Sequence, residues 1–588
     1  MNAAVLLVIS LVILVCGYVF YGGWLAKTWG IDPSRKTPAH ELEDGNDYIP
    51  TKAPVLMGHH FSSIAGAGPI NGPIQAAVFG WVPVLLWVLI GGIFFGGVHD
   101  FGALFASLRH KGQSIGEIIG DTMGVKAKRL FISFAYLTIL LVIAAFSAIV
   151  ANTFEATYDP ATGVLDKAAS SANASTAIIS LLFIVMAIIF GFFVYRKNAP
   201  VGISTIIGII GIVAVMIIGL NWHPIYMTNH QWMFVIGIYI AIASVTPVWI
   251  LLQPRDYLSS FLLYFMIALA VIGIIGSHVT LKIPAFLGFK DTLFADNGYT
   301  DGKSLGFMFP ALFVTIACGA ISGFHSLVSS GTTAKQLDNE KQALPIAYGS
   351  MLLECVVAVI SICAVGYIWD TYKTGEMINP PKVFATGISS MIASLPGLSK
   401  TGNSVFAMLI LAVSVFCLTS LDTSTRIARY MFQEFWLEPG QTVSDVKGFK
   451  KVLVNPYVAT IITVVIGIAL GMTGYANIWP LFGAANQLLA ALGLLAVATW
   501  LGKVGKNNKM FYVPMVFMLV VTISSLFLTL KTNIAGIAAG ADGVVWCYIR
   551  TVIAALLVVL ALVLAVDSVK TMIAEAKANK TKAGKEAA

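Results

Sequence analysis

The chain has 588 residues, of which 58% are hydrophobic and only 11% are charged. Soluble domains carry about a quarter charged residues, so this composition and a mean hydropathy of +0.86 exclude a soluble protein and indicate a membrane protein with many spans. The net charge of +8 does not indicate a nucleic-acid partner, because the basic residues are scattered among loops in the way that membrane topology explains.

Apolar runs bounded by charged residues or by Gly/Pro turns predict an all-α integral membrane protein with about fifteen spans. Their approximate limits are 2–25, 53–79, 81–107, 130–153, 175–195, 200–220, 232–252, 257–281, 307–331, 346–369, 404–425, 453–473, 477–501, 511–531 and 545–566. The first run lacks a basic leader region and is too long for a signal sequence. We therefore expect a retained helix, and its alternative is a cleaved leader.

The loops predict an orientation. When residues 26–52 are placed in the cytoplasm and the sides alternate, most of the 36 lysines and arginines fall on the cytoplasmic side. This arrangement predicts an N-terminus outside the cell and a cytoplasmic, basic tail at residues 567–588.

The second span contains a cluster of helix breakers, GAGPINGP, at residues 66–73. A break at membrane depth leaves backbone groups unsatisfied at a cost of several kcal/mol each, unless protein, water or a ligand satisfies them. A half-helix that starts near Pro69 points its positive end at the break and suits a carboxylate, whereas the carbonyls of Ile64 and Ala65 suit a cation. The expected substrate-binding residues here are Gly66, Ala67, Gly68, Pro69 and Ile70. The alternative is an ordinary kinked helix.

A second interruption is predicted five spans later, where Thr246 and Pro247 fall within the seventh span, and these two residues are also expected to bind substrate. Because five is odd, the two interrupted spans run in opposite directions, which is typical of an inverted-repeat transporter. We therefore expect a five-plus-five core with repeats at 53–220 and 232–425. One helix at 1–25 precedes this core, and four helices at 453–566 follow it.

Polar residues within the spans are the further candidates, because ionisable groups in a membrane usually face a cavity or one another. The ninth span carries hydroxyls that either coordinate a coupling ion or bond back to their own helix; they are Ser326, Ser329, Ser330, Thr332 and Thr333. Asp422 and Arg426, four residues apart, are expected to form an ion pair that acts as a clamp or gate.

Histidines and further charged residues are the remaining candidate functional residues within the spans. His59 and His60 precede the first break and are candidates for proton coupling, although a structural hydrogen bond is the alternative for either one. The expected inner charge network, or alternatively a set of ordinary interface charges, consists of His99, Asp100, Arg255 and Asp256. Glu354 in the tenth span is a further titrating candidate.

Six cysteines lie inside apolar runs without a CxxC pair, so we expect small buried residues and neither disulfides nor a metal site. Nucleotide-binding and hydrolase motifs are missing from the sequence, which argues against an enzyme. No cofactor is expected beyond H⁺ or Na⁺ as a coupling ion.

Several long motifs resemble the carbon starvation protein A (CstA) family. They are GHHFSSIAGAGPINGPIQAAVFG, GGVHDFGAL, LLQPRDYLSSF, GFHSLVSSGTTAKQL, LTSLDTSTRIARY and IWPLFGAANQLLAAL, and the likeness runs from about residue 33 to 500. The resemblance implies a bacterial inner-membrane transporter of the amino acid–polyamine–organocation type, with a LeuT-like core. It also implies uptake of peptides during carbon starvation, or of pyruvate with protons.

For a peptide, Asp422 or Glu354 would pair with the amino terminus. Asn486 and Gln487 of the last motif serve either helix–helix hydrogen bonding or substrate contact.

These observations together predict a secondary active importer of small carboxylates, driven by an H⁺ or Na⁺ gradient through alternating access. Its partners are then the lipid bilayer and a small-molecule substrate. The alternatives are a membrane sensor that binds its nutrient without moving it, and a channel.

Overall fold

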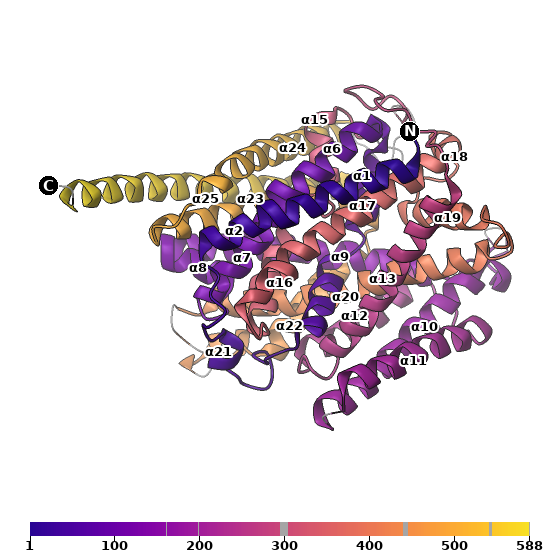
Figure 1. Cartoon of the computed structure of the whole chain (residues 1–588), viewed down its shortest axis with the longest axis horizontal. Helices are drawn as coiled ribbons and strands as arrows, with labels where there is room; N and C mark the ends of the chain where they lie inside the picture. Colours follow the sequence, from indigo (N-terminus) through magenta and orange to yellow (C-terminus); the bar gives the residue numbers. More distant parts are fainter. Residues whose placement is uncertain are drawn as a thin grey trace.

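The computed structural model describes residues 1–159, 162–197, 199–294, 304–438, 441, 445–539 and 544–586. Figure 1 shows a bundle of helices from which the C-terminal helix projects at one side. Eleven helices in the described part are long and apolar enough to cross a membrane. They are α1–η1–α2 (Ala3–Trp29), α6–η3–α7 (Trp81–Arg109), α9 (Val125–Phe154), α10 (Lys167–Gly191) with η4, α11 (Val201–Asn221), α13 (Leu252–Ser277), η7 with α17 (Ser350–Tyr367), α20 (Gly402–Trp436), α23 (Tyr475–Lys503), α24 (Tyr512–Ala538) and α25 (Val544–Glu586).

Two shorter apolar helices and two interrupted ones accompany them. The shorter helices are α12 (Asn229–Val245) and α22 (Pro456–Gly471). The interrupted ones are α4 (Ala53–Ile64) with α5 (Gly68–Ala76), and α15 (Met308–Thr315) with α16 (Gly323–Gly331). Short helices at the two ends are α3 (Pro38–Glu41), α8 (Ile115–Met123), α18 (Trp369–Lys373), α19 (Pro380–Ala393) and α21 (Phe449–Leu453).

The outward faces of the bundle are apolar. On α11, for example, Ile206, Ile207 and Ile210 each expose more than 60% of their surface. Contiguous exposed isoleucines are unfavourable in water but match the acyl chains of a bilayer. The chain is therefore a multi-pass membrane protein, as its composition predicts.

The two ends of the bundle differ. Helix α4 begins at one end, where the Thr51 amide donates to the Gln336 carbonyl (3.0 Å). Because Lys52, Arg109 and Lys335 also lie there, we call this the basic end. At the opposite end α5 finishes, where the Tyr372 hydroxyl donates to the Ile74 carbonyl over 2.8 Å.

The predicted interruption of the second span is present. Helix α4 ends at Ile64 and α5 begins at Gly68, so residues 65–67 break the span. Pro69 stands in the first turn of α5, where its missing N–H is least costly. The glycines and proline of this stretch therefore produce a true break and not a kink.

The interruption predicted at Thr246 and Pro247 is wrong. Helix α12 starts at the opposite end, where the Ala156 amide meets the Met227 carbonyl (3.0 Å), and α13 finishes at that same end beside Met1. The chain thus reverses direction at residues 246–251. Pro247 begins a turn closed by the Ile250 amide (3.1 Å), so this proline lies between two spans at the basic end.

The second break lies in the predicted ninth span instead. Helix α15 ends at Thr315 and α16 begins at Gly323, which leaves residues 316–322 without a continuous helix. The α15–α16 pair runs from the opposite end, where the Met308 amide donates to the Phe289 carbonyl (2.8 Å), to the basic end. Its direction is therefore opposite to that of α4–α5.

Four helices pack together as a group in which α9, α12, α20 and α22 each contact the others, and α20 joins this group to α4 and α16 of the interrupted pairs. Helix α13 packs along α4, and α23 packs along α16. The α10–α11 hairpin lies at the edge of the bundle in Figure 1, where α10 packs on α13.

Candidate functional site

The two breaks lie against each other in the middle of the bundle. A β-carbon added to Gly68 would lie only 2.4 Å from the Cys318 Cβ, and one added to Gly72 would lie 2.7 Å from the Thr315 carbonyl oxygen. Any side chain larger than hydrogen at these positions would force the helices apart. Glycine in the first interrupted helix thus allows its backbone to touch the second break.

Asn486 and Gln487 of α23 satisfy the backbone of the second break. The Asn486 Oδ1 accepts from the Phe324 amide (2.9 Å), and its Nδ2 donates to the Ser322 Oγ (3.0 Å). The Gln487 Nε2 donates to the carbonyls of Phe313 and Ile316 at 3.2 and 3.3 Å. Of the two roles that the sequence left open, these contacts provide the helix–helix hydrogen bonding, because buried backbone groups need partners at this depth.

The first break has no such support on its amide side. No described group accepts from the Gly66 or Gly68 amide, whereas the Ile70 amide is taken by the Ala67 carbonyl at 3.2 Å. Pro69 has no N–H to offer. The Ala67 amide donates to the Cys417 sulfur. Of the five predicted substrate-binding positions, Gly66 and Gly68 therefore present amides without a partner in the described chain, at the positive end of α5.

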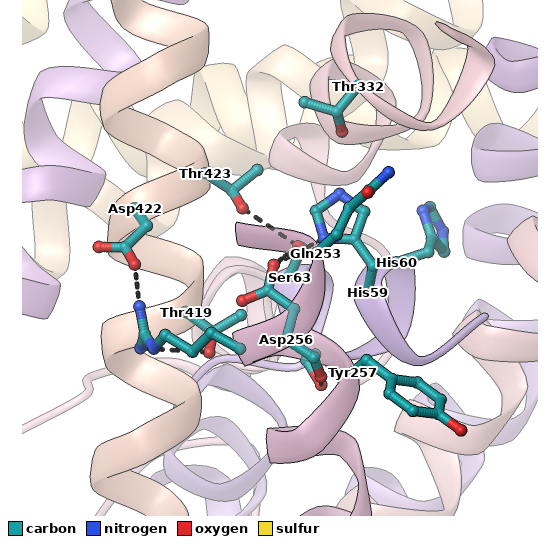
Figure 2. Close-up of polar contacts among 12 residues, drawn as sticks. His59, His60, Ser63, Gln253, Asp256, Tyr257, Thr332, Thr419, Asp422 and Thr423 are labelled. Carbon is teal, nitrogen blue, oxygen red and sulfur yellow. Dashed lines mark hydrogen bonds and ion pairs between the residues drawn. The ribbon is translucent and has the colours of Figure 1, made fainter. Parts of the chain in front are cut away.

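Hydroxyls on α20 lie beside the carbonyl side of this break. The Ser63 Oγ is 3.1 Å from the Thr423 Oγ1, as Figure 2 shows. A β-carbon added to Gly66 would lie 3.1 Å from the Ser420 Oγ, and that hydroxyl has no hydrogen-bond partner within the described chain. The carbonyls of Ile64 and Ala65, predicted as cation ligands, thus have α20 hydroxyls as neighbours.

The predicted hydroxyl stripe on α16 has mostly local partners. Ser326, Ser330 and Thr332 donate to carbonyls three or four residues earlier in the chain, over 2.8–2.9 Å. Thr333 instead contacts the His60 Nδ1 at 2.8 Å, and Ser329 has no partner among the described residues. For Ser326, Ser330 and Thr332 the structure therefore shows the alternative, a hydrogen bond back to the preceding turn of the chain. Sequence reasoning missed Ser420, although it stands two residues before Asp422 in the same motif.

His59 pairs with Asp256 across α4 and α13. The His59 Nδ1 lies 2.6 Å from the Asp256 Oδ2, both side chains are fully buried, and Ser63 approaches the same oxygen at 3.5 Å. Figure 2 shows the two side chains between these helices, with Thr423 beyond Ser63. A buried histidine and carboxylate in contact can share one proton, which gives this pair the chemistry of a proton carrier.

Arg255 pairs with Asp422 of α20, and the Tyr239 hydroxyl donates to the same carboxylate at 2.6 Å. The expected pair of Asp422 with Arg426 is wrong, because the two side chains leave α20 toward different neighbours. Arg426 reaches Asp47 (3.2 Å) and the carbonyl of Thr246. Spacing along one helix does not fix a partner when other helices pack on both sides.

Asp47 ties the segment before α4 to the basic end. It accepts from the Tyr430 hydroxyl (2.5 Å) and from Arg426, while the Lys335 ammonium lies over the Tyr48 and Tyr430 rings. Burial alone would raise the pKa of Asp47, but Lys335 and Arg426 outweigh it and hold that pKa below its usual range. The carboxylate is therefore ionised at neutral pH and bonds the segment before α4 to α20.

The predicted inner network of four charges is wrong, because it divides into two groups. His99 and Asp100 are bonded at 2.7 Å, and the second Asp100 oxygen lies 2.9 Å from the His325 Nδ1. The His325 Nε2 then faces Glu354 at 3.3 Å. No ion pair joins this group to Arg255 or Asp256 in the described chain, since those two residues face Asp422 and His59.

A cavity of about 130 Å³ lies at the opposite end, between α5, α9, α10, α19 and α20. Its polar lining residues are Asn71, Asn152, Thr153, Asn173, Thr176, Asn379 and Lys382. Asn71 lies one turn beyond the first break, so the cavity leads from this end of the bundle toward the break.

The fold is that of a multi-pass membrane protein with two interrupted helices in contact, ion pairs at the basic end and a cavity at the opposite end. The chain matches the family described as carbon starvation protein CstA over residues 2–379 and 371–525. It belongs to this family.

Three named relatives align with most of the chain. It is 34% identical to the peptide transporter CstA of Campylobacter jejuni, over 89% of this chain and 79% of that protein. It is 31% identical to the peptide transporter CstA of Bacillus subtilis, over 91% and 90%. It is 30% identical to the pyruvate/proton symporter BtsT of Escherichia coli, over 90% and 82%. These relatives are transporters and not enzymes.

Among solved structures, a manganese transporter of Eremococcus coleocola aligns with 91% of this chain and 99% of its own at 12% identity. The TM-score is 0.49.

Proposed function

We propose that this protein is a secondary active transporter that imports a small carboxylate, pyruvate or a short peptide, by alternating access around the two breaks. The observation that carries the proposal is the contact of the start of α5, directly after the break at 65–67, with the break at 316–322, in interrupted helices of opposite direction. Broken helices that meet at the membrane midplane present backbone dipoles to a ligand, and a continuous bundle lacks them.

The arrangement of helices favours a five-plus-five inverted repeat with boundaries that differ from the predicted ones. The first repeat then contains α4–α5, α6–α7, α9, α12 and α13, and the second contains α15–α16, α17, α20, α22 and α23. The packing of α13 on α4 is matched by that of α23 on α16, as such a repeat requires. The α10–α11 hairpin is an insertion, and with α1, α24 and α25 the spans number about fifteen.

The amides of Gly66 and Gly68 are the proposed anchor for the substrate carboxylate. They are the positions in the predicted set whose N–H groups lack a partner, and they stand at the positive end of α5. Pyruvate and a peptide each present a carboxylate to this anchor, in agreement with the names of the relatives.

The His59–Asp256 pair is the proposed carrier of the coupling proton. His59 lies nearly two turns before the first break, and its partner Asp256 contacts Ser63, so a change of charge on the pair acts on the last turn of α4. The relative named as a pyruvate/proton symporter agrees with this choice.

The structure supports a closed basic end and an accessible opposite end. Two ion pairs hold the basic end together, Arg255–Asp422 and Asp47–Arg426. The cavity beside Asn71 leads inward from the opposite end of the bundle. With the basic end in the cytoplasm, as the positive-inside rule predicts, this is the arrangement that receives substrate from outside.

Uptake into proteoliposomes tests the proposal. Labelled pyruvate and labelled dialanine are supplied with an inward H⁺ gradient or an inward Na⁺ gradient, each imposed alone. We expect accumulation of at least one substrate under the H⁺ gradient and none under Na⁺ alone. His59→Gln should abolish the response to the H⁺ gradient. His40→Gln, a change at a half-exposed histidine of the basic end, should leave it intact. Accumulation of neither substrate under any gradient would refute the proposal.

A further inference from the structure

Cys318, His325 and Glu354 bring a thiol, an imidazole and a carboxylate together beside the second break. One possible ligand atom from each lies within 4.8 Å of the other two, and all three side chains are buried. Cys318 lies in the break, His325 in the first turn of α16, and Glu354 in α17. Cys318 and His325 are seven residues apart and Glu354 follows 29 residues later, a spacing that matches none of the usual metal-ligand motifs.

Polar atoms of this cluster lack partners. The His325 Nε2 and the Glu354 Oε2 face each other at 3.3 Å without the geometry of a hydrogen bond, and neither these atoms nor the other Glu354 oxygen has a hydrogen-bond partner in the described chain. A carboxylate removed from water costs several kcal/mol unless a hydrogen bond or a cation compensates it. The buried face between Glu354 and His325 therefore has unmet bonding capacity that a cation would satisfy.

Asp100 fixes His325 in the orientation that metal binding needs. The Asp100 Oδ2 accepts from the His325 Nδ1 at 2.9 Å, so the Nε2 lone pair faces Glu354 and Cys318. Metal-ligating histidines typically donate their other ring N–H to a carboxylate in this way. The other Asp100 oxygen is held in turn by His99 at 2.7 Å.

The donor set selects the class of ion. A thiolate, an imidazole and a carboxylate suit Zn²⁺ and the similar ions Co²⁺ and Cd²⁺, whereas Mg²⁺ and Ca²⁺ prefer oxygen ligands alone. Bond lengths of about 2.0–2.3 Å place neighbouring tetrahedral ligands about 3.3–3.8 Å apart. Binding thus requires the three side chains to close by about 1 Å, a change within the reach of rotamer adjustments.

We propose that Cys318, His325 and Glu354 bind one divalent ion of the Zn²⁺ class, with Asp100 as the positioning residue. The bound ion would link the second break and α16 to α17. This inference rests on the cluster alone and does not depend on the transport activity proposed above.

Cobalt absorption spectroscopy on the purified full chain tests the site. The protein is freed of metal with a chelator and titrated with Co²⁺, whose thiolate complexes show a sulfur-to-cobalt charge-transfer band. We expect this band to saturate at one Co²⁺ per chain and to disappear when Zn²⁺ is added. Cys318→Ser should abolish the band. Asp100→Asn should weaken Co²⁺ binding about 10- to 100-fold, the usual effect of losing such a partner.

A matched control is available in α17. Cys363→Ser changes a buried cysteine of the helix that carries Glu354, and it should leave both the band and the affinity unchanged. Glu354→Gln provides a second variant, expected to lower the affinity while it keeps the charge-transfer band. Each variant is first shown to be monodisperse and to unfold near the wild-type temperature. No charge-transfer band in the wild type, or a band that persists in Cys318→Ser, would overturn the proposal.

Discussion

The substitution Gly68→Ala tests the contact between the two breaks. The new methyl group would lie 2.4 Å from the Cys318 Cβ and 2.5 Å from its Sγ. Carbon atoms in contact need about 3.5–4.0 Å, so one of the two breaks must move by more than 1 Å. The backbone at Gly68 is helical and accepts alanine without strain, which leaves the clash as the sole cost.

Overpacking of this kind costs about 1–3 kcal/mol. If the cost falls on the arrangement in which the breaks touch, its population relative to the others falls about 5- to 150-fold. The initial rate of substrate uptake should fall by the same factor. Because Cys318 supplies the clashing atom, Cys318→Gly in the same chain should restore much of the lost rate, as expected for residues in contact.

Uptake by proteoliposomes that contain matched amounts of protein measures the rate, and thermal unfolding measures stability. Gly202→Ala in α11 is the control, since nothing lies within 4 Å of its added carbon. It should transport normally and gain about 0.5–1 kcal/mol of stability, because alanine is the better helix former. Wild-type uptake and stability in Gly68→Ala would refute the packing argument.

Three further predictions concern the supports of the site. Asn486→Ala removes the partner of the Phe324 amide and should cost about 1–3 kcal/mol in thermal unfolding; an unchanged unfolding temperature would contradict this. Arg255→Met leaves Asp422 buried without its ion-pair partner and should cost about 3–5 kcal/mol, most of it recovered when Asp422 is also changed to Leu. No recovery in the double variant would show that the pair is not the cause. Asp47→Asn should cost up to about 1 kcal/mol at pH 7, and the difference should fade as the pH falls below 3.8, because a lowered pKa stabilises the folded state only while the carboxylate is ionised. An equal difference at pH 7 and pH 3 would exclude an electrostatic role.

The first break was predictable because glycines and prolines leave a local signal. The sequence GAGPINGP disfavours one continuous helix, and the structure interrupts the span at residues 65–67, just before α5 begins at Gly68. The second break has no proline between its two half-helices. Its signal was Gly319, Ser322 and Gly323, together with the amide pair of α23, and only the folded chain brings these together.

Pro247 misled the prediction for a related reason. A proline in an apolar stretch marks either a break within a span or a turn between two spans, and hydropathy does not separate the two when the turn is short and apolar. The segment 246–251 contains Val248, Trp249 and Ile250, so the turn resembles the span that precedes it. The direction of the flanking helices decides the matter, and only the structure shows it.

Partners of charged residues were the least predictable part. The residues themselves were found, because ionisable groups are rare within spans. Their partners depend on how helices from distant parts of the chain pack. Asp422 therefore meets Arg255 and not Arg426, and Asp100 meets His325, which lies outside the predicted network.

Counterflow tests the central claim that the two facing breaks form the substrate site. Proteoliposomes loaded with unlabelled pyruvate or dialanine are diluted into the labelled compound without any ion gradient, so that only binding and alternating access are required. Gly66→Ala places a methyl group 2.8 Å from the Phe146 ring, beside the proposed carboxylate anchor. The account predicts counterflow in the wild type and in Gly202→Ala, and its loss in Gly66→Ala. Equal counterflow in Gly66→Ala and the wild type would contradict it.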